Sequence, residues 1–109
     1  MVLLVATPAL GMSLLWAQPA KQKPAGDADR GKTAFSGQCA VCHNADSTVK
    51  KIGPGLKGLF KKAKLQNGKA VTEANIRAVL DAGGNGMPPF KEMLNAAQKD
   101  DVIAYLKAL

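Results

Sequence analysis

Both cysteines and the single histidine of this chain of 109 residues fall within five consecutive positions, Cys39-Ala40-Val41-Cys42-His43. Three such side chains cannot complete the four-ligand site of a structural zinc ion. A disulfide between Cys39 and Cys42 would close a very small loop and would stabilise the fold little. A thioredoxin-like redox pair would need a βαβ context, whereas the sequence pattern is helical.

The spacing C-x-x-C-H is the pattern of covalent haem c attachment. Two thiols three positions apart can reach both vinyl groups of one porphyrin, and the adjacent His43 then lies under the iron as its proximal ligand. The sequence therefore predicts one haem c bound through two thioethers at Cys39 and Cys42. A haem-free dithiol protein using the same cysteines is the alternative.

The N-terminal residues predict export. An apolar run of 16 residues spans positions 2–17, which is short for a membrane-spanning helix of about 20 residues and fits a secretory signal. No basic residue precedes the run, as would be usual for a signal. We expect residues 1–17 to be a signal peptide, with an uncleaved anchor as the alternative. Because bacteria attach haem c outside the cytoplasm, the motif agrees with export, and we expect a periplasmic protein.

The rest of the chain divides into a leader and one folded domain. Residues 18–26 contain two prolines and two lysines but no large apolar side chain, which is typical of a flexible leader. The domain at 27–109 has only 83 residues, so its core is marginal by itself and needs help from a disulfide, a metal or a buried cofactor. Asp27 can cap a helix that runs to about Ser36, where Gly37 is expected to break the pattern.

Two further helices are predicted towards the C terminus. Thr72 is a suitable N-cap for a helix that Gly83-Gly84 ends. Asn95 and Gln98 resemble a capping box at the start of a last helix. One or two short helices are expected within residues 49–65. Because no alternating strand of useful length is present, the predicted fold class is all-α.

Together these residues resemble the class I c-type cytochromes, which are small single-haem electron carriers. The resemblance covers nearly the whole folded part. Gly31 and Phe35 are similar to positions of that family's N-terminal helix, and Tyr105-Leu106 to the C-terminal helix that packs across it. The resemblance implies three main helices, short helices and loops wrapped around one covalently attached haem.

The resemblance also assigns the haem pocket. Gly53-Pro54 followed by Leu56 is similar to the loop whose proline carbonyl receives the second ring proton of the proximal histidine, which in this chain is His43. The segment Gly86-Met87-Pro88-Pro89-Phe90 is similar to the distal methionine loop. Pro54, Leu56 and Phe90 are therefore expected in the pocket or directly behind it.

Four methionines are possible sixth ligands of the iron. Met1 and Met12 lie in the signal, and Met93 lies just before the last helix, where packing is the usual role. Met87 lies in an irregular loop, so it is the preferred partner of His43. With both axial positions filled, the chain is expected to be an electron carrier and not an enzyme. A haem sensor or ligand-binding protein with a labile distal methionine is the alternative.

Basic residues are concentrated in one stretch. The chain has 15 basic and 8 acidic residues, a net charge of +7. Seven lysines lie between Lys50 and Lys69, without an acidic residue among them. This stretch is either a solvated face or a docking surface for an acidic membrane or periplasmic redox protein. We do not expect the protein to bind nucleic acid. We expect it to be a monomer. Arg77, Asn67 and the lysines are the possible partners of the haem propionates.

Overall fold

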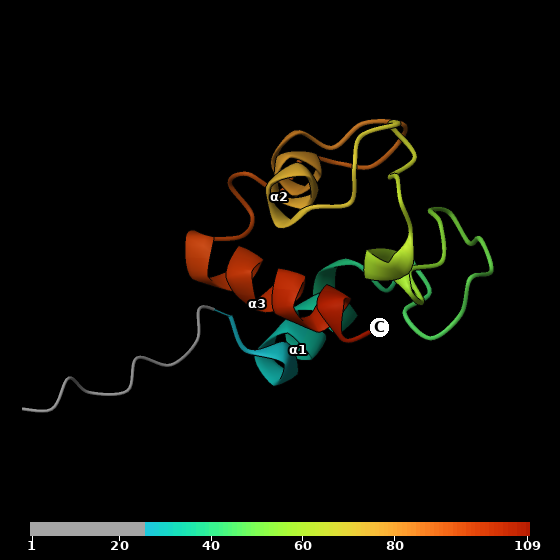
Figure 1. Ribbon diagram of the computed structural model, residues 1–109. Helices are drawn as coiled ribbons and strands as arrows, with labels where there is room; N and C mark the ends of the chain where they lie inside the picture. Colours follow the sequence, from blue (N-terminus) through green and yellow to red (C-terminus); the bar gives the residue numbers. More distant parts are fainter. Residues whose placement is uncertain (1–25) are drawn as a thin grey trace, which may run out of the picture.

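The computed structural model describes residues 26–109, so the expected signal peptide and nearly all of the leader lie outside the described residues. Three α-helices, α1 (Ala28–Gln38), α2 (Glu73–Ala82) and α3 (Ala96–Lys107), and one 3₁₀ helix, η1 (Leu59–Lys61), form this part of the chain. Figure 1 shows α3 lying against α1, with α2 on the other side of α3. Residues 26–109 contain isolated bridges but no strand, which confirms the all-α prediction.

Helix α1 begins where the sequence predicts but ends later. The Asp27 side chain accepts a hydrogen bond from the Arg30 backbone N–H and caps the helix. The helix then continues through Gly37 to Gln38, so the expected break at Gly37 is wrong. A glycine inside a helix costs only about 1 kcal/mol. Packing of α1 against α3 outweighs that cost.

The crossing of α1 and α3 depends on a close approach at Gly31. A Cβ atom at Gly31 would overlap the Asp101 carbonyl oxygen and would lie 2.8 Å from the Tyr105 Cβ. One turn further along, the rings of Phe35 and Tyr105 meet edge to face with their centroids 5.4 Å apart, a favoured aromatic geometry. The missing side chain at Gly31 thus lets the two helices pack backbone to backbone.

Local hydrogen bonds set the starts of α2 and α3 as predicted. The Thr72 hydroxyl accepts from the Asn75 N–H, and α2 ends at Gly83, whose φ is 65°. Asn95 and Gln98 form the reciprocal capping box. The 3₁₀ helix η1 is one of the short helices expected between residues 49 and 65.

Much of the apolar core also lines one cavity. Ten apolar side chains are buried: Phe35, Cys39, Leu59, Ile76, Leu80, Phe90, Leu94, Val102, Ile103 and Leu106. Six of these ten also line one cavity: Cys39, Leu59, Ile76, Leu80, Phe90 and Leu106. More than half of the core therefore faces a space that a bound group can fill. Within the described residues, no helix is both long and apolar enough to cross a membrane.

Candidate functional site

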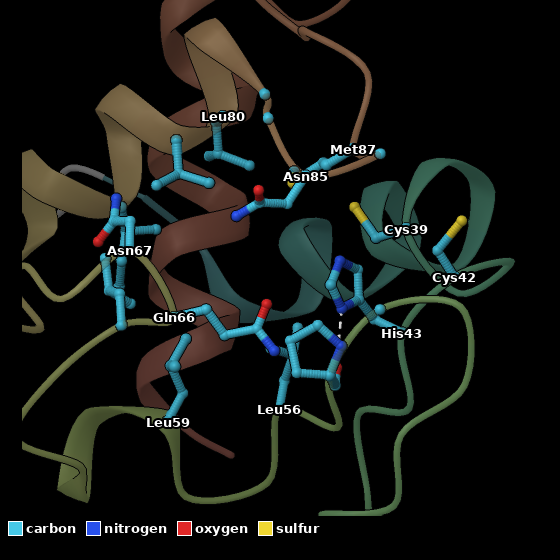
Figure 2. Close-up of a pocket in the computed structure, with 18 of the residues that line it drawn as sticks. Cys39, Cys42, His43, Leu56, Leu59, Gln66, Asn67, Leu80, Asn85 and Met87 are labelled. Carbon is cyan, nitrogen blue, oxygen red and sulfur yellow. Dashed lines mark hydrogen bonds between the residues drawn. The ribbon is translucent and has the colours of Figure 1, made fainter.

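The cavity has a volume of about 650 Å³, which is within the usual range of roughly 300–1,000 Å³ for cofactor sites. Its walls come from the end of α1, the loop at residues 50–56, helix α2 and the loop that follows α2. Figure 2 shows Cys39, Cys42 and His43 together at one side of the cavity and Met87 on the loop opposite. All seven haem-pocket residues expected from the sequence line this one cavity: Cys39, Cys42, His43, Pro54, Leu56, Met87 and Phe90.

The two cysteines and the histidine are held by a turn that follows α1. The backbone N–H groups of Cys42 and His43 both donate to the Cys39 carbonyl oxygen, at 3.0 and 2.9 Å. This turn presents both thiols and the imidazole to the same cavity (Figure 2). The arrangement suits one flat group that receives two sulfur bonds at its edge and one nitrogen ligand from below.

The His43 ring has one defined orientation. Its Nδ1 atom lies 2.8 Å from the Pro54 carbonyl oxygen. Because a carbonyl oxygen only accepts hydrogen bonds, Nδ1 carries the proton and Nε2 keeps a free lone pair. Figure 2 shows the second ring nitrogen turned towards the cavity. A histidine held in this way is prepared to ligate a metal.

Gly53 leaves the space that the His43 ring occupies. A Cβ atom at this position would lie 2.5 Å from the ring Cε1 and 2.8 Å from Nδ1. The Gly53 N–H also donates to the Cys42 carbonyl oxygen at 2.7 Å. The Gly-Pro pair therefore positions the imidazole in two ways. Gly53 leaves space for the ring, and the Pro54 carbonyl oxygen accepts a hydrogen bond from Nδ1–H.

Met87 is presented by a tight turn directly after α2. Gly84 and Met87 exchange both backbone hydrogen bonds, at 2.9 and 3.0 Å. The two residues between them, Asn85 and Gly86, have φ angles of 52° and 87°, as a type I′ turn with an Asn-Gly pair requires. Met87 is half-buried, whereas Met93 is 54% exposed and does not line the cavity. Among residues 26–109, Met87 is thus the only thioether at the cavity.

The cysteine environment favours a neutral sulfur. Burial raises the pKa of the Cys39 thiol to about 11, and the neighbouring Cys42 adds to this rise. Reactive cysteines of redox proteins have a lowered thiol pKa. The Cys39 thiol is therefore unsuited to act as a thiolate nucleophile. A thioether, which carries no charge, suits this environment.

Polar residues of the cavity lie at the end of the basic stretch. Lys62, Lys64, Gln66 and Asn67 line it, as does Lys50 at the start of the stretch. Asn67 and these three lysines therefore stay possible partners of haem carboxylates. Arg77 does not line the cavity, and its guanidinium pairs instead with Asp100.

Other lining residues had not been assigned to the pocket from the sequence. Ile76, Val79 and Leu80 show the i, i+3, i+4 spacing of an apolar helix face, and that pattern is the same whether the face meets protein or cofactor. Gln66 carried no signal that could have placed it at the cavity.

Taken together, the residues fit a haem c. The donor set is two thiols, one oriented imidazole nitrogen and one thioether, arranged around an apolar cavity of suitable size. In the part of the chain that the structure describes, no group of three or more His, Cys, Asp and Glu side chains could hold a metal ion directly.

Comparisons with known proteins agree with this interpretation. Residues 26–106 match the profile of the family described as cytochrome c oxidase, cbb3-type, subunit III. The chain is 40% identical to cytochrome c6 of Rippkaea orientalis over 84 residues, which cover 77% of this chain and 72% of the relative. It is 34% identical to cytochrome c6 of Synechocystis, with 75% and 65% covered.

A solved structure shows the same fold. The structure of cytochrome c6 from the diatom Phaeodactylum tricornutum superposes with a TM-score of 0.58 at 30% identity, covering 76% of this chain and 93% of that one. The all-helical architecture, the haem attachment motif and these relatives agree. The chain therefore belongs to the family of class I c-type cytochromes, small electron carriers with one covalently bound haem c.

Proposed function

We propose that this protein carries single electrons on a haem c that is bound by Cys39 and Cys42 and ligated by His43 and Met87. The observation that carries the proposal is the relation of His43 to the cavity. Its Nδ1 proton is held by the Pro54 carbonyl at 2.8 Å, and Met87 stands on the loop across the same cavity (Figure 2). When bound, the haem supplies the Fe(II)/Fe(III) couple that holds the electron.

The axial residues would define the chemistry of the site. Met87 contributes a thioether, which favours Fe(II) and raises the potential. With His43 and Met87 both ligating a bound iron, the protein would leave no open position for dioxygen or peroxide. These properties suit a carrier and disfavour an oxygenase or a peroxidase.

The cavity walls would tune the potential in the same direction. Leu59, Leu80 and Phe90 are buried and line the cavity. An apolar environment disfavours the additional positive charge of the ferric state. Pro54 would act through His43 by fixing its ring plane, and Leu56 and Phe90, which line the cavity, would pack against the bound haem.

We further propose that the protein is exported to the periplasm, where it exchanges electrons with an acidic redox protein. The basic stretch 50–69 borders the cavity, because Lys50, Lys62 and Lys64 all line it and all are exposed. Positive charge at the rim of the cavity would orient an acidic partner towards the haem. Such steering raises the association rate and is weakened by salt.

The test is a matched pair of variants, Met87→Ala and Met93→Ala, in haem-loaded protein processed by its own host. We expect M87A to lose the far-red sulfur–iron band of the ferric form, to lower the potential and to bind carbon monoxide in the reduced form. M93A should keep the native spectrum because Met93 is exposed. An unchanged spectrum and potential in M87A would contradict the assignment of Met87.

A further inference from the structure

One lysine joins both ends of the loop that carries Met87. The loop leaves α2 at Gly83 and returns at Phe90, whose N–H donates to the Leu80 carbonyl oxygen at 2.7 Å. The ammonium of Lys99 on α3 lies 2.6 Å from the Asp81 carboxylate in the last turn of α2. The same ammonium donates to the Lys91 carbonyl oxygen, directly after Phe90, at 3.3 Å. Lys99 therefore bridges the residues on either side of the loop.

Lys99 is unusually buried for a lysine. The residue is only 8% exposed, and lysines are almost never buried without a partner. The Asp81 Oδ1 atom is itself buried, and its near neighbour is the Lys99 ammonium. A cation at this place also suits the negative C-terminal end of the α2 dipole. The Asp81 side chain as a whole is 36% exposed, so the buried part of the pair is the lysine and one carboxylate oxygen. Burial of these two groups favours a contact that holds its geometry, in contrast to a mobile surface pair.

Two other ion pairs join the same helices and provide a comparison. Glu73, Arg77 and Asp81 are spaced by four residues, so they lie on one face of α2. They pair in antiparallel order with three residues of α3: Lys107, Asp100 and Lys99. The Glu73–Lys107 pair is about half exposed at both side chains. Only the Asp81–Lys99 pair combines burial of its lysine with a contact beyond the loop.

We propose that Lys99 is a positioning residue that keeps Met87 over the iron by fastening both ends of the Gly83–Phe90 loop to α3. The inference rests on the proposed ligation by Met87. Gly83, Gly84 and Gly86 all have positive φ, and glycine gives a chain wide conformational freedom. The loop can open unless its ends are held. The Phe90 N–H bond to the Leu80 carbonyl oxygen joins the two ends to each other, and Lys99 fastens both of them to α3.

The test compares haem-loaded wild type with K99M, the double variant D81N/K99M and the control E73Q/K107M. The first measurement is the affinity of the ferric protein for imidazole, which must displace Met87. The second is thermal unfolding, in which the temperature at which the far-red sulfur–iron band disappears is compared with the temperature at which the helical circular dichroism is lost. We expect K99M to bind imidazole about tenfold more tightly, because the open loop is more populated. Its band should disappear at a temperature below that of helix unfolding.

The double variant separates the loss of the Lys99 bridge from the destabilisation that an unpaired Asp81 carboxylate would cause in K99M. D81N/K99M buries no unpaired charge and should fold even if K99M does not, because replacing a buried ion pair is often tolerated. It still lacks the bridge to the Lys91 carbonyl, so its imidazole affinity should also exceed that of wild type. The control E73Q/K107M should match wild type in both measurements.

The outcomes distinguish this inference from the ligation itself. If wild type lacks the far-red band, the proposed ligation by Met87 fails. If wild type has the band but the Lys99 variants bind imidazole like wild type and lose the band together with their helices, Lys99 supports only the global fold. The positioning role is then overturned while the ligation stands.

Discussion

The Nδ1 atom of His43 lies 2.8 Å from the carbonyl oxygen of Pro54, a residue eleven positions later in the chain. The contact fixes the tautomer of the imidazole and directs Nε2 into the cavity. Gly53 makes the contact possible because a side chain there would occupy the space of the ring. The proximal side of the site is therefore ordered by the fold of the Gly53-Pro54 segment.

Replacing Gly53 with alanine should disturb the His43 ring. The new Cβ atom would lie 2.5 Å from the ring Cε1, so the ring or the loop must shift. Inserting a methyl group into a closely packed site costs about 1–3 kcal/mol of unfolding free energy. Denaturant unfolding and the ferric spectrum of haem-loaded G53A measure the two effects. A variant with native stability and native spectrum would show that Gly53 is not needed for this geometry.

Gly37→Ala should stabilise the protein. Gly37 lies inside α1 but is exposed, and a Cβ atom there would meet no other atom within 4 Å. Alanine in a helix is more favourable than glycine by roughly 0.5–1 kcal/mol. A higher midpoint of urea unfolding with an unchanged slope and spectrum is the expected result. A loss of stability would mean that Gly37 has a role in the α1 turn before Cys39.

Gly31→Ala should have the opposite effect on the same helix. Its Cβ atom would overlap the Asp101 carbonyl oxygen at the crossing of α1 and α3. The helices would have to separate, and overpacking of this kind costs about 1–3 kcal/mol or more. Comparing G31A with G37A by denaturant unfolding holds the chemistry of the substitution constant. Equal stabilities of the two variants would refute the close approach.

Asp101 should make stability depend on pH. Hydrogen bonds from the Arg30 guanidinium, with a further one from the Asp27 N–H, hold the pKa of the Asp101 carboxyl below its usual value of 3.8. Because the folded pKa is lowered, the stabilisation is complete well above pH 3.8 and is lost as the pH falls through the folded pKa. D101N should therefore be less stable than wild type at pH 7, with a smaller difference at pH 3.

Urea unfolding at the two pH values checks this prediction for Asp101. The control Asp46→Asn changes an exposed loop carboxylate and should show no comparable dependence. A stability difference between D101N and wild type that is equal at pH 7 and pH 3 would exclude the ion pair as its source.

Local patterns predicted much of this fold. The caps at Thr72 and Asn95 were predictable because each hydrogen bond joins residues three apart in sequence. The end of α1 was not predictable from Gly37, because helix propensity does not include the packing of α1 against α3. The Asn85-Gly86 pair is a strong turn signal, but its role in presenting Met87 depends on where α2 ends.

Contacts distant in sequence could not be predicted from local patterns. The Asp81–Lys99 bridge joins two helices, and no spacing rule relates its partners. Ile76 and Leu80 have the spacing of an apolar helix face, but a residue that faces a cofactor has the same periodicity as one that faces protein. Only the three-dimensional arrangement distinguishes the two.

The most direct measurement is the visible and far-red spectrum of the haem-loaded, host-processed protein, oxidised and then reduced, beside M87A. We expect a six-coordinate low-spin haem c in wild type, with the weak ferric sulfur–iron band that M87A lacks. A high-spin wild-type spectrum, or a low-spin one without that band, would contradict ligation of the iron by His43 and Met87.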